Sequence, residues 1–292
     1  MPDIVIHALG AAAYAGLAWH FWHTRWRARP AADASSSGLR PWERAAILVP
    51  LTLHGALLYA GLFAATELRF GFAHALSTML WLAVLFYWVE SLFYNLEGMQ
   101  PPALALAALA VPLPALFPGR ASGAYAASIE FKLHLVLAML AYSLFTIAIL
   151  HALLMALVER RLHQAHSARG LGGASLADGA SMLAGPLGAL PPLLTQERLL
   201  FRLIAAAFVL LTCTLATGIA FSESLFGRPL RFDHKTLFAV LSWVTFALLL
   251  TGRHLYGWRG RTALRWTLSG FVLLLLAYVG SRFALEVVLG RN

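Results

Sequence analysis

Charged residues are scarce in this sequence. Asp, Glu, Lys and Arg make up 12% of the 292 residues, whereas 60% are hydrophobic. Soluble domains usually carry about 25% charged residues, and the mean hydropathy here is +0.73. Because long apolar stretches recur from one end to the other, this composition excludes a separate soluble domain of ordinary size. We therefore expect a single transmembrane domain over residues 1–292.

Cysteine is nearly absent, since Cys213 is the only one. A single thiol excludes an intramolecular disulfide, a paired-cysteine redox relay and a thiolate metal site. Cys213 falls deep in an apolar stretch, so we expect it to pack as a small core residue.

Several functional motifs are missing as well. The sequence has no internal repeat, no phosphate-binding glycine loop and no supported Ser/His/Asp arrangement, and we expect that it is not an enzyme. It has no arginine–aromatic stripe of the nucleic-acid-binding kind. The sequence pI of about 10.3 is better explained by membrane topology and anionic lipids. We expect membrane lipids as partners and no nucleic acid.

What the sequence does contain is a series of apolar stretches of membrane-spanning length. About 20 apolar residues cover a hydrocarbon core of roughly 30 Å. No charged n-region precedes the first stretch and basic residues follow it, which favours a span over a signal peptide. The fourth contains Pro112, Pro114 and Pro118, which predict a kinked or partly re-entrant segment. The sequence predicts an all-α, polytopic membrane protein with about eight transmembrane helices, near 3–23, 44–65, 72–94, 102–118, 130–158, 199–222, 234–252 and 264–286.

The basic residues predict the orientation. Loops 24–44, 159–202 and 253–265 hold fourteen of the 22 Lys and Arg residues, and the opposite face holds the other eight. By the positive-inside rule these loops face the cytoplasm of a bacterial inner membrane, and both termini are periplasmic. Residues 163–197 are rich in Gly, Ala, Ser and Pro, which predicts a flexible cytoplasmic loop. Thr195 is expected to cap the following helix.

Histidines are the candidate ligands, because ionisable groups inside a bilayer are costly to keep there. His134 lies about one turn into the fifth span, and His234 lies in the first turn of the seventh, both at the outer face. Two neutral imidazoles at one depth suit axial ligation of haem iron. His54, near the midplane of the second span, and His254, towards the cytoplasmic side, are the alternative ligands.

Cations gather near the same pair, although they run against the positive-inside trend. Haem propionates need such partners. The candidates are Lys132, Arg228, Arg231, Lys235 and Arg282. Simpler explanations stay open: membrane histidines often make interhelical hydrogen bonds, Asp233 suits a helix N-cap, and Lys235 and Arg231 suit snorkelling to lipid phosphates.

At these residues the sequence resembles the haem-handling cytochrome c assembly superfamily of CcsA and CcmC, and more closely its YpjD/HemX branch. KLHLVLAMLAYSLF resembles the helix that a periplasmic histidine opens, which makes His134 the matching residue. GIAFSESLFGRPLRFDHKTLFAVLSW resembles a reduced form of the tryptophan-rich segment, with Phe232, Asp233, His234 and Lys235 in its Trp-Asp-Pro-Lys places. PPLLTQERLLFR, GWRGR at 257–261 and AYVGSR at 277–282 resemble YpjD sequences. The resemblance covers residues 130–285 well and the first four spans only in number and order.

The resemblance and the residues together predict an inner-membrane protein that binds or handles haem at its periplasmic face, with cytochrome c assembly proteins among its possible partners. One alternative is a HemX-like accessory protein, which acts on tetrapyrrole synthesis through a cytoplasmic partner. A second is a small-solute transporter, which is disfavoured because the two halves lack matching broken helices.

Overall fold

The fold is all helical, as predicted. A computed structural model describes residues 2–27, 39–63, 68–94, 98–119, 128–170, 193–226 and 233–289, and these contain no strand. Helix is the expected solution, because a chain in hydrocarbon must satisfy its backbone hydrogen bonds within each segment.

Helices make up nearly all of the described residues. Three short π-helical segments, η1, η3 and η4, extend α1 or interrupt the last pass. The bounds are α1 Pro2–Phe21, η1 Trp22–Arg27, α2 Pro41–Phe63, α3 Phe72–Phe93, α4 Gln100–Ala110, α5 Leu113–Leu116, α6 Ile129–Gly170, α8 Leu193–Phe226, α9 His234–Tyr256, α10 Gly260–Leu275, η3 Leu276–Gly280, α11 Ser281–Phe283 and η4 Ala284–Val288.

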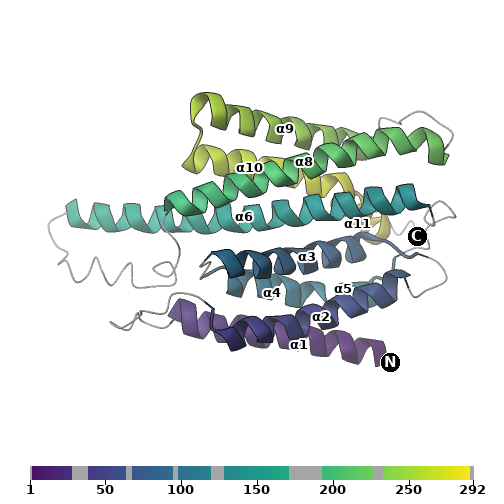
Figure 1. The fold of residues 1–292 in the computed structure, drawn as a ribbon, viewed down its shortest axis with the longest axis horizontal. Coiled ribbons are helices and arrows are strands. Elements are labelled where there is room, and N and C mark those ends of the chain that lie inside the picture. The colour runs from purple at the N-terminus through teal and green to yellow at the C-terminus, as the bar shows by residue number, and fades with distance from the viewer. Residues whose placement is uncertain are drawn as a thin grey trace.

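Successive passes alternate in direction, so both termini lie at the same end of the bundle (Figure 1). We call this the terminal end and the other the opposite end. Among the described residues, seven helices are long and apolar enough to cross a membrane, and Gln100–Leu116 forms a shorter apolar helix. Its first residues lie at the opposite end, where the Trp26 indole Nε1 donates to the Gly98 carbonyl at 3.1 Å. Its last residues lie at the terminal end, where the Phe72 and Phe117 rings are 5.1 Å apart.

The fourth pass is therefore made by α4 and α5 together, broken at Val111 and Pro112. The break agrees with the kink that the prolines predict, since a proline removes a backbone donor and clashes with the preceding turn. With this broken pass, the described residues traverse the bundle eight times.

The predicted loop over 163–197 is wrong at both ends. Helix α6 continues to Gly170 and α8 already begins at Leu193. The stretch after Arg160 is rich in good helix formers and holds no Gly or Pro before Gly170, so nothing in it stops the helix. Thr195 consequently lies inside the first turn of α8 and does not cap it. Residues 171–192 lie outside the described residues.

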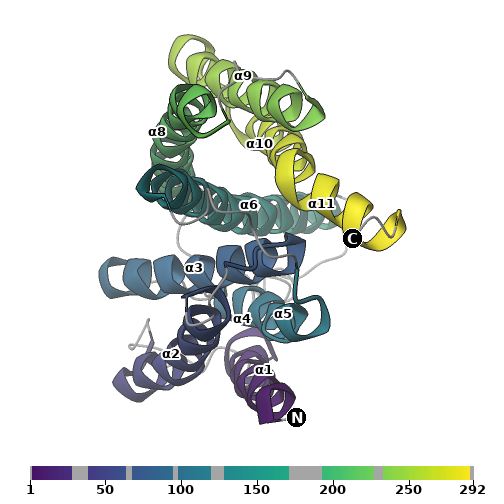
Figure 2. The ribbon, with the colours of Figure 1, turned by 90° about the vertical axis from the view of Figure 1, so that its right-hand side faces the viewer.

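Two groups of helices pack side by side, α1 to α5 and α6 to η4, with α3 against α6 between them (Figure 2). In the second group the Phe145 ring of α6 stacks on the Phe246 ring of α9, with centroids 3.9 Å apart. The Tyr142 hydroxyl of α6 donates to the Leu274 carbonyl at 2.6 Å, and the Ser242 hydroxyl of α9 donates to the Gly270 carbonyl at 2.8 Å. These contacts fix α6, α9 and α10 relative to one another.

Candidate haem site

His134 lies in the second turn of α6, at the terminal end, and is half-buried against α8. Its Nδ1 is 3.1 Å from the Thr217 hydroxyl oxygen. That oxygen also lies 2.9 Å from the Cys213 carbonyl and 3.0 Å from the Thr214 carbonyl. A hydroxyl has one hydrogen, and a carbonyl can only accept. All of these contacts can therefore be hydrogen bonds only when Thr217 donates to a carbonyl and His134 Nδ1 donates to Thr217, an arrangement that puts the ring's lone pair on Nε2.

Helix α8 makes room for this imidazole with a glycine. A Cβ atom on Gly218 would lie 3.3 Å from His134 Cε1, closer than ordinary van der Waals contact. A larger residue at this position would require the ring to shift by a few tenths of an ångström. The pair Thr217–Gly218 thus sets both the tautomer and the position of His134.

His234 lies at the same depth as His134. His134 precedes Phe145 by eleven residues and His234 precedes the stacked Phe246 by twelve, which at 1.5 Å per residue are about 17 and 18 Å towards the terminal end. The two histidines point in different directions from their helices, however. Eleven residues make about three whole turns of an α-helix, whereas twelve make about three and a third turns. His134 therefore shares the inward face of Phe145, whereas His234 is turned away from that of Phe246 and is exposed.

Lys235, also eleven residues before Phe246, takes the inward position instead and is half-buried. It lies close enough to Arg282 for the two charges to repel each other. The structure thus places His134 and Lys235 at one depth on the inward faces of their helices, with Arg282 near Lys235. Lys132 is exposed on α6. Arg228 and Arg231 lie outside the described residues.

Asp233 has the simpler role that the sequence predicts for it, that of a helix N-cap. Its Oδ1 accepts the Thr236 backbone N–H at 3.0 Å and the Thr236 hydroxyl at 3.2 Å, so it is the N-cap of α9. Burial alone would raise the pKa of this carboxyl, but the two Thr236 hydrogen bonds and the Lys235 charge hold it below its ordinary value.

The alternative ligands lie in different surroundings. His54 of α2 is 1% exposed, and its Nε2 is 2.8 Å from the Ser77 hydroxyl of α3. Its Nδ1 has no hydrogen-bond partner among the described residues. His254 is exposed in the last turn of α9, at the opposite end.

Sequence reasoning missed two groups of buried polar residues. His74 of α3 is 4% exposed, and its Nδ1 and the buried Tyr14 hydroxyl both lack a hydrogen-bond partner within the described part of the chain. At the opposite end, His151 Nε2 of α6 lies 3.5 Å from Glu90 Oε2 of α3. The sequence signal that could have found these four residues was their position, because all four polar side chains fall within predicted membrane spans.

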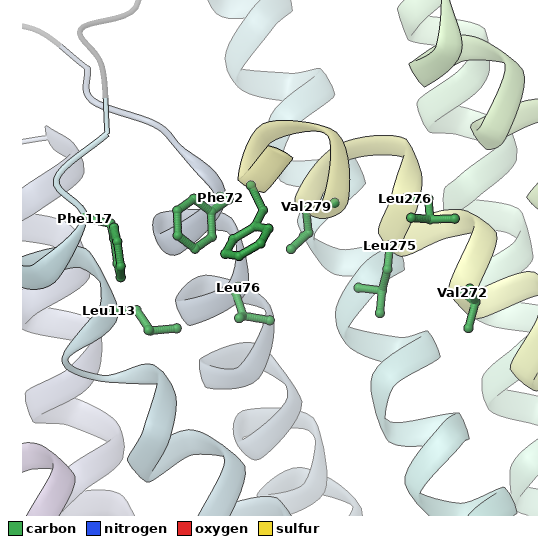
Figure 3. A pocket seen from close by; sticks show the side chains of 10 residues that line it. Phe72, Leu76, Leu113, Phe117, Val272, Leu275, Leu276 and Val279 are labelled. Carbon is green, nitrogen blue, oxygen red and sulfur yellow. The ribbon is translucent and has the colours of Figure 1, made fainter. Parts of the chain in front are cut away.

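An apolar groove lies near the terminal end, between α3 and α5 on one side and α10, η3 and α11 on the other (Figure 3). Its volume is about 550 Å³, and every lining residue is apolar. No residue of α6 lines it, so the groove is separate from the surroundings of His134.

These features define a polytopic helical membrane protein with a histidine set into the end of its bundle. A family profile described as cytochrome c assembly protein matches residues 43–289. The chain belongs to this family, and the match takes in α2 to α5, beyond the region 130–285 in which the sequence resemblance is strongest.

Named relatives agree with the family. A 28.8 kDa uncharacterised protein of Azospirillum brasilense is 33% identical over 229 residues, which are 74% of this chain and 76% of that protein. The inner membrane protein YpjD of Escherichia coli K12 is 32% identical over 155 residues, 53% of this chain and 52% of YpjD. The cytochrome c biogenesis protein CcsA of Prochlorococcus marinus MIT 9515 is 36% identical over 87 residues, 30% of this chain and 28% of CcsA. The match thus spans about half of YpjD and less of CcsA. No solved structure matches the chain.

Proposed function

We propose that this protein holds haem at the terminal end of its C-terminal helices, as part of cytochrome c assembly. The observation that carries the proposal is the hydrogen-bond network of His134, which favours a proton on Nδ1 and supports Nε2 as the ligand atom. Histidine ligands of metals commonly have their other ring nitrogen fixed in this way. The half-buried setting suits a tetrapyrrole, which needs apolar walls and a neutral imidazole.

Lys235 is the propionate partner that fits best among the described cations, because it is inward-facing and half-buried at the depth of His134. In a partly dry site a cation–carboxylate pair is stronger than in water. Arg231 is the second anchor that we propose, and His234 the second iron ligand. When bound, the haem would supply a redox-active iron and the group that cytochromes c carry.

We further propose that the protein is not an enzyme and that a partner makes the covalent bond to the apocytochrome. The residues described here bind and orient: His134 offers a lone pair, Thr217 fixes its tautomer, and Lys235 offers a charge. The proposal places this end in the periplasm of the bacterial inner membrane. Reporter fusions at Ser175 and Gly260 should then give a cytoplasmic signal, and fusions at Gly123 and Gly227 a periplasmic one. Periplasmic activity at Ser175 would reverse the orientation.

The absorption spectrum of the purified protein tests the haem proposal directly. We expect a Soret band and, on reduction, separate α and β bands. A colourless preparation from cells supplied with haem precursors, which also takes up no haem when haem is added, would overturn it.

A second candidate is an accessory protein of tetrapyrrole synthesis, favoured by the length of α6. Its apolar span ends at Arg160, yet the helix continues to Gly170 beyond the rest of the bundle at the opposite end (Figure 1). Such an extension suits contact with a partner in the cytoplasm. A colourless protein that captures a tetrapyrrole-synthesising enzyme, and loses it when residues 163–170 are replaced by Gly and Ser, would favour this candidate.

A further inference from the structure

The lining of the groove at the terminal end suits a hydrocarbon chain. Leu76 of α3 and Leu113 of α5 face Leu275 and Val279 across it (Figure 3). All ten lining residues are apolar, and both halves of the molecule contribute. A water-soluble ligand would find no hydrogen-bonding side chain here, which excludes most polar small molecules.

The groove opens sideways and is closed at its end. Val272 and Leu276 on its edge are 52% and 41% exposed, and both belong to a membrane-spanning segment, so this edge faces lipid. At the terminal end Phe72 contacts both Phe117 and Phe283, with ring centroids 5.1 and 5.3 Å apart. An occupant therefore enters from the bilayer and not from the aqueous side.

The length of the groove matches one leaflet. Its lining on the last pass runs from Val272 to Phe283, which at 1.5 Å per residue is about 17 Å. Half of a hydrocarbon core of roughly 30 Å is about 15 Å. The groove thus accommodates one acyl chain lying along the bilayer normal.

A loosely paired cation and anion lie at the closed end. Arg282 and Glu286 are 3.9 Å apart, too far for a hydrogen bond. Arg282 Nε and Glu286 Oε1 are buried, and neither has a hydrogen-bond partner among the described residues. The Glu286 side chain is only 10% exposed, and its carboxylate lies over Gly71, where a Cβ would be 2.8 Å from Oε2. Buried polar atoms without partners are costly, so this pair is suited to a ligand that carries both charges.

We propose that the groove binds a zwitterionic phospholipid of the terminal-end leaflet, with one acyl chain between α3, α5 and the last pass. The phosphate pairs with Arg282, and the ammonium of the headgroup pairs with Glu286. This site is distinct from the proposed haem site: it assigns Arg282 to lipid and leaves Lys235 for the propionate. The bound lipid fills the gap between the two halves of the bundle where α3 and η3 come together.

The acyl chain is tested by filling the groove. Val279→Trp places a large ring in it, and Leu248→Trp adds the same ring to an exposed position of α9. After purification in mild detergent, we expect wild type and Leu248→Trp to retain phosphatidylethanolamine in native mass spectra, and Val279→Trp to lose at least about fivefold. Leu76→Phe, a smaller change in the same groove, replaces Val279→Trp if that variant does not fold. Equal retention in the groove variant and the control would overturn the proposal.

The headgroup is tested with defined lipids. Delipidated protein is titrated with dioleoyl phosphatidylethanolamine or dioleoyl phosphatidylglycerol, and the melting temperature is recorded. We expect the ethanolamine lipid to stabilise wild type more, and Arg282→Gln and Glu286→Gln each to weaken its apparent affinity about tenfold, as for loss of one charge-assisted contact. Equal effects of the two lipids, or unchanged affinity in both variants, would overturn the headgroup assignment.

The two proposals fail separately. Val279→Trp should keep the haem spectrum of wild type, while Lys235→Gln should lose haem and keep the lipid. A protein that retains lipid but never binds haem would contradict only the proposed function. A haem-loaded protein without selective lipid retention would contradict only the groove.

Discussion

The two halves of the bundle use the same polar residue types in opposite ways. In α1 to α5, His54, His74 and the Tyr14 hydroxyl are almost completely buried, and each has an atom without a partner in the described residues. In α6 to η4, His134 lies half-buried at the end of the bundle with a defined tautomer, and the Tyr142 hydroxyl is hydrogen-bonded. Only the second arrangement offers a ligand atom near a face that a large group can reach. We therefore propose that ligand binding belongs to the C-terminal half, and the following predictions test that contrast.

The largest expected effect is on haem. His134→Ala removes the proposed ligand atom and should lower the haem absorbance per folded protein at least about tenfold, as expected when an iron ligand is lost. His234→Ala should abolish or shift the spectrum, whereas His163→Ala and His166→Ala should leave it unchanged. His54→Ala, in the other half, should also keep the spectrum. If both outer variants keep an unchanged spectrum, His54 and His254 become the candidates and the contrast between the halves is wrong.

A smaller effect is expected from a buried carboxylate in the N-terminal half. Glu43 is 2% exposed; it accepts hydrogen bonds from the Arg25 guanidinium and the Arg40 backbone N–H at 2.8 Å and pairs with His20 Nε2 at 3.2 Å. Glu43→Gln should cost about 3–5 kcal/mol, because the cations around it lose their counter-charge. The measurement is thermal unfolding in detergent. The matched control is Glu159→Gln. Glu159 Oε1 lies 3.8 Å from Nε of Arg261, whose side chain is 66% exposed, so this substitution should cost at most about 1 kcal/mol. Equal costs would show that the ion pairs of the two halves are equally exposed to solvent.

Tyr14 in the N-terminal half and Tyr142 in the C-terminal half give a matched pair of buried hydroxyls. Tyr142→Phe removes the hydrogen bond to the Leu274 carbonyl and should destabilise the protein by about 1–3 kcal/mol. Tyr14→Phe removes a buried hydroxyl that has no partner among the described residues and should be neutral or slightly stabilising. Thermal unfolding of both variants measures the difference. A cost for Tyr14→Phe as large as that for Tyr142→Phe would mean that Tyr14 is bonded to a group such as an ordered water.

The smallest effect is expected at the cap of α9. Asp233→Ala should cost about 1 kcal/mol and Asp233→Asn much less, since asparagine keeps an acceptor for Thr236. The pKa of Asp233 is lowered in the folded protein, so its contribution is present above the unfolded value of about 3.9 and is lost as pH falls through the folded pKa. Unfolding of wild type and Asp233→Ala should therefore converge at low pH. Convergence at high pH instead would contradict the cap.

The sequence predicts the helical passes well because apolar length is a local property. Each of the long passes contains most of a predicted span, namely α1, α2, α3, α6, α8, α9 and the last pass, Gly260–Val288. Pro112 marks the break in the fourth pass. The helix ends are predicted less well. Residues 163–170 and 193–197 were expected in a loop but are helical, because helix propensity continues after apolarity stops. A hydropathy pattern finds where the membrane ends and not where the helix ends.

The sequence indicated how far along their helices the two histidines lie but not which way they face. His134 and His234 lie at one depth, yet the residue of α9 that faces inward there is Lys235, one residue further along. His74 and the Glu90–His151 pair were missed because nothing in the sequence says which helices become neighbours. Asp233 was predicted as an N-cap, and the structure confirms it, since capping is local to one turn.

By itself, the sequence determined that this protein is an all-helical, multi-pass membrane protein, and how far along their helices His134 and His234 lie. Both follow from counting residues along single helices, where each residue adds 1.5 Å. Only the tertiary structure decided that His134 meets Thr217 and Gly218, that Lys235 faces inward, and that a groove opens between the halves. Each residue also turns a helix by about 100°, so the contacts between helices depend on how each is rotated about its own axis. That rotation is set by the packing of side chains such as Phe145 against Phe246, which are 101 residues apart in the chain.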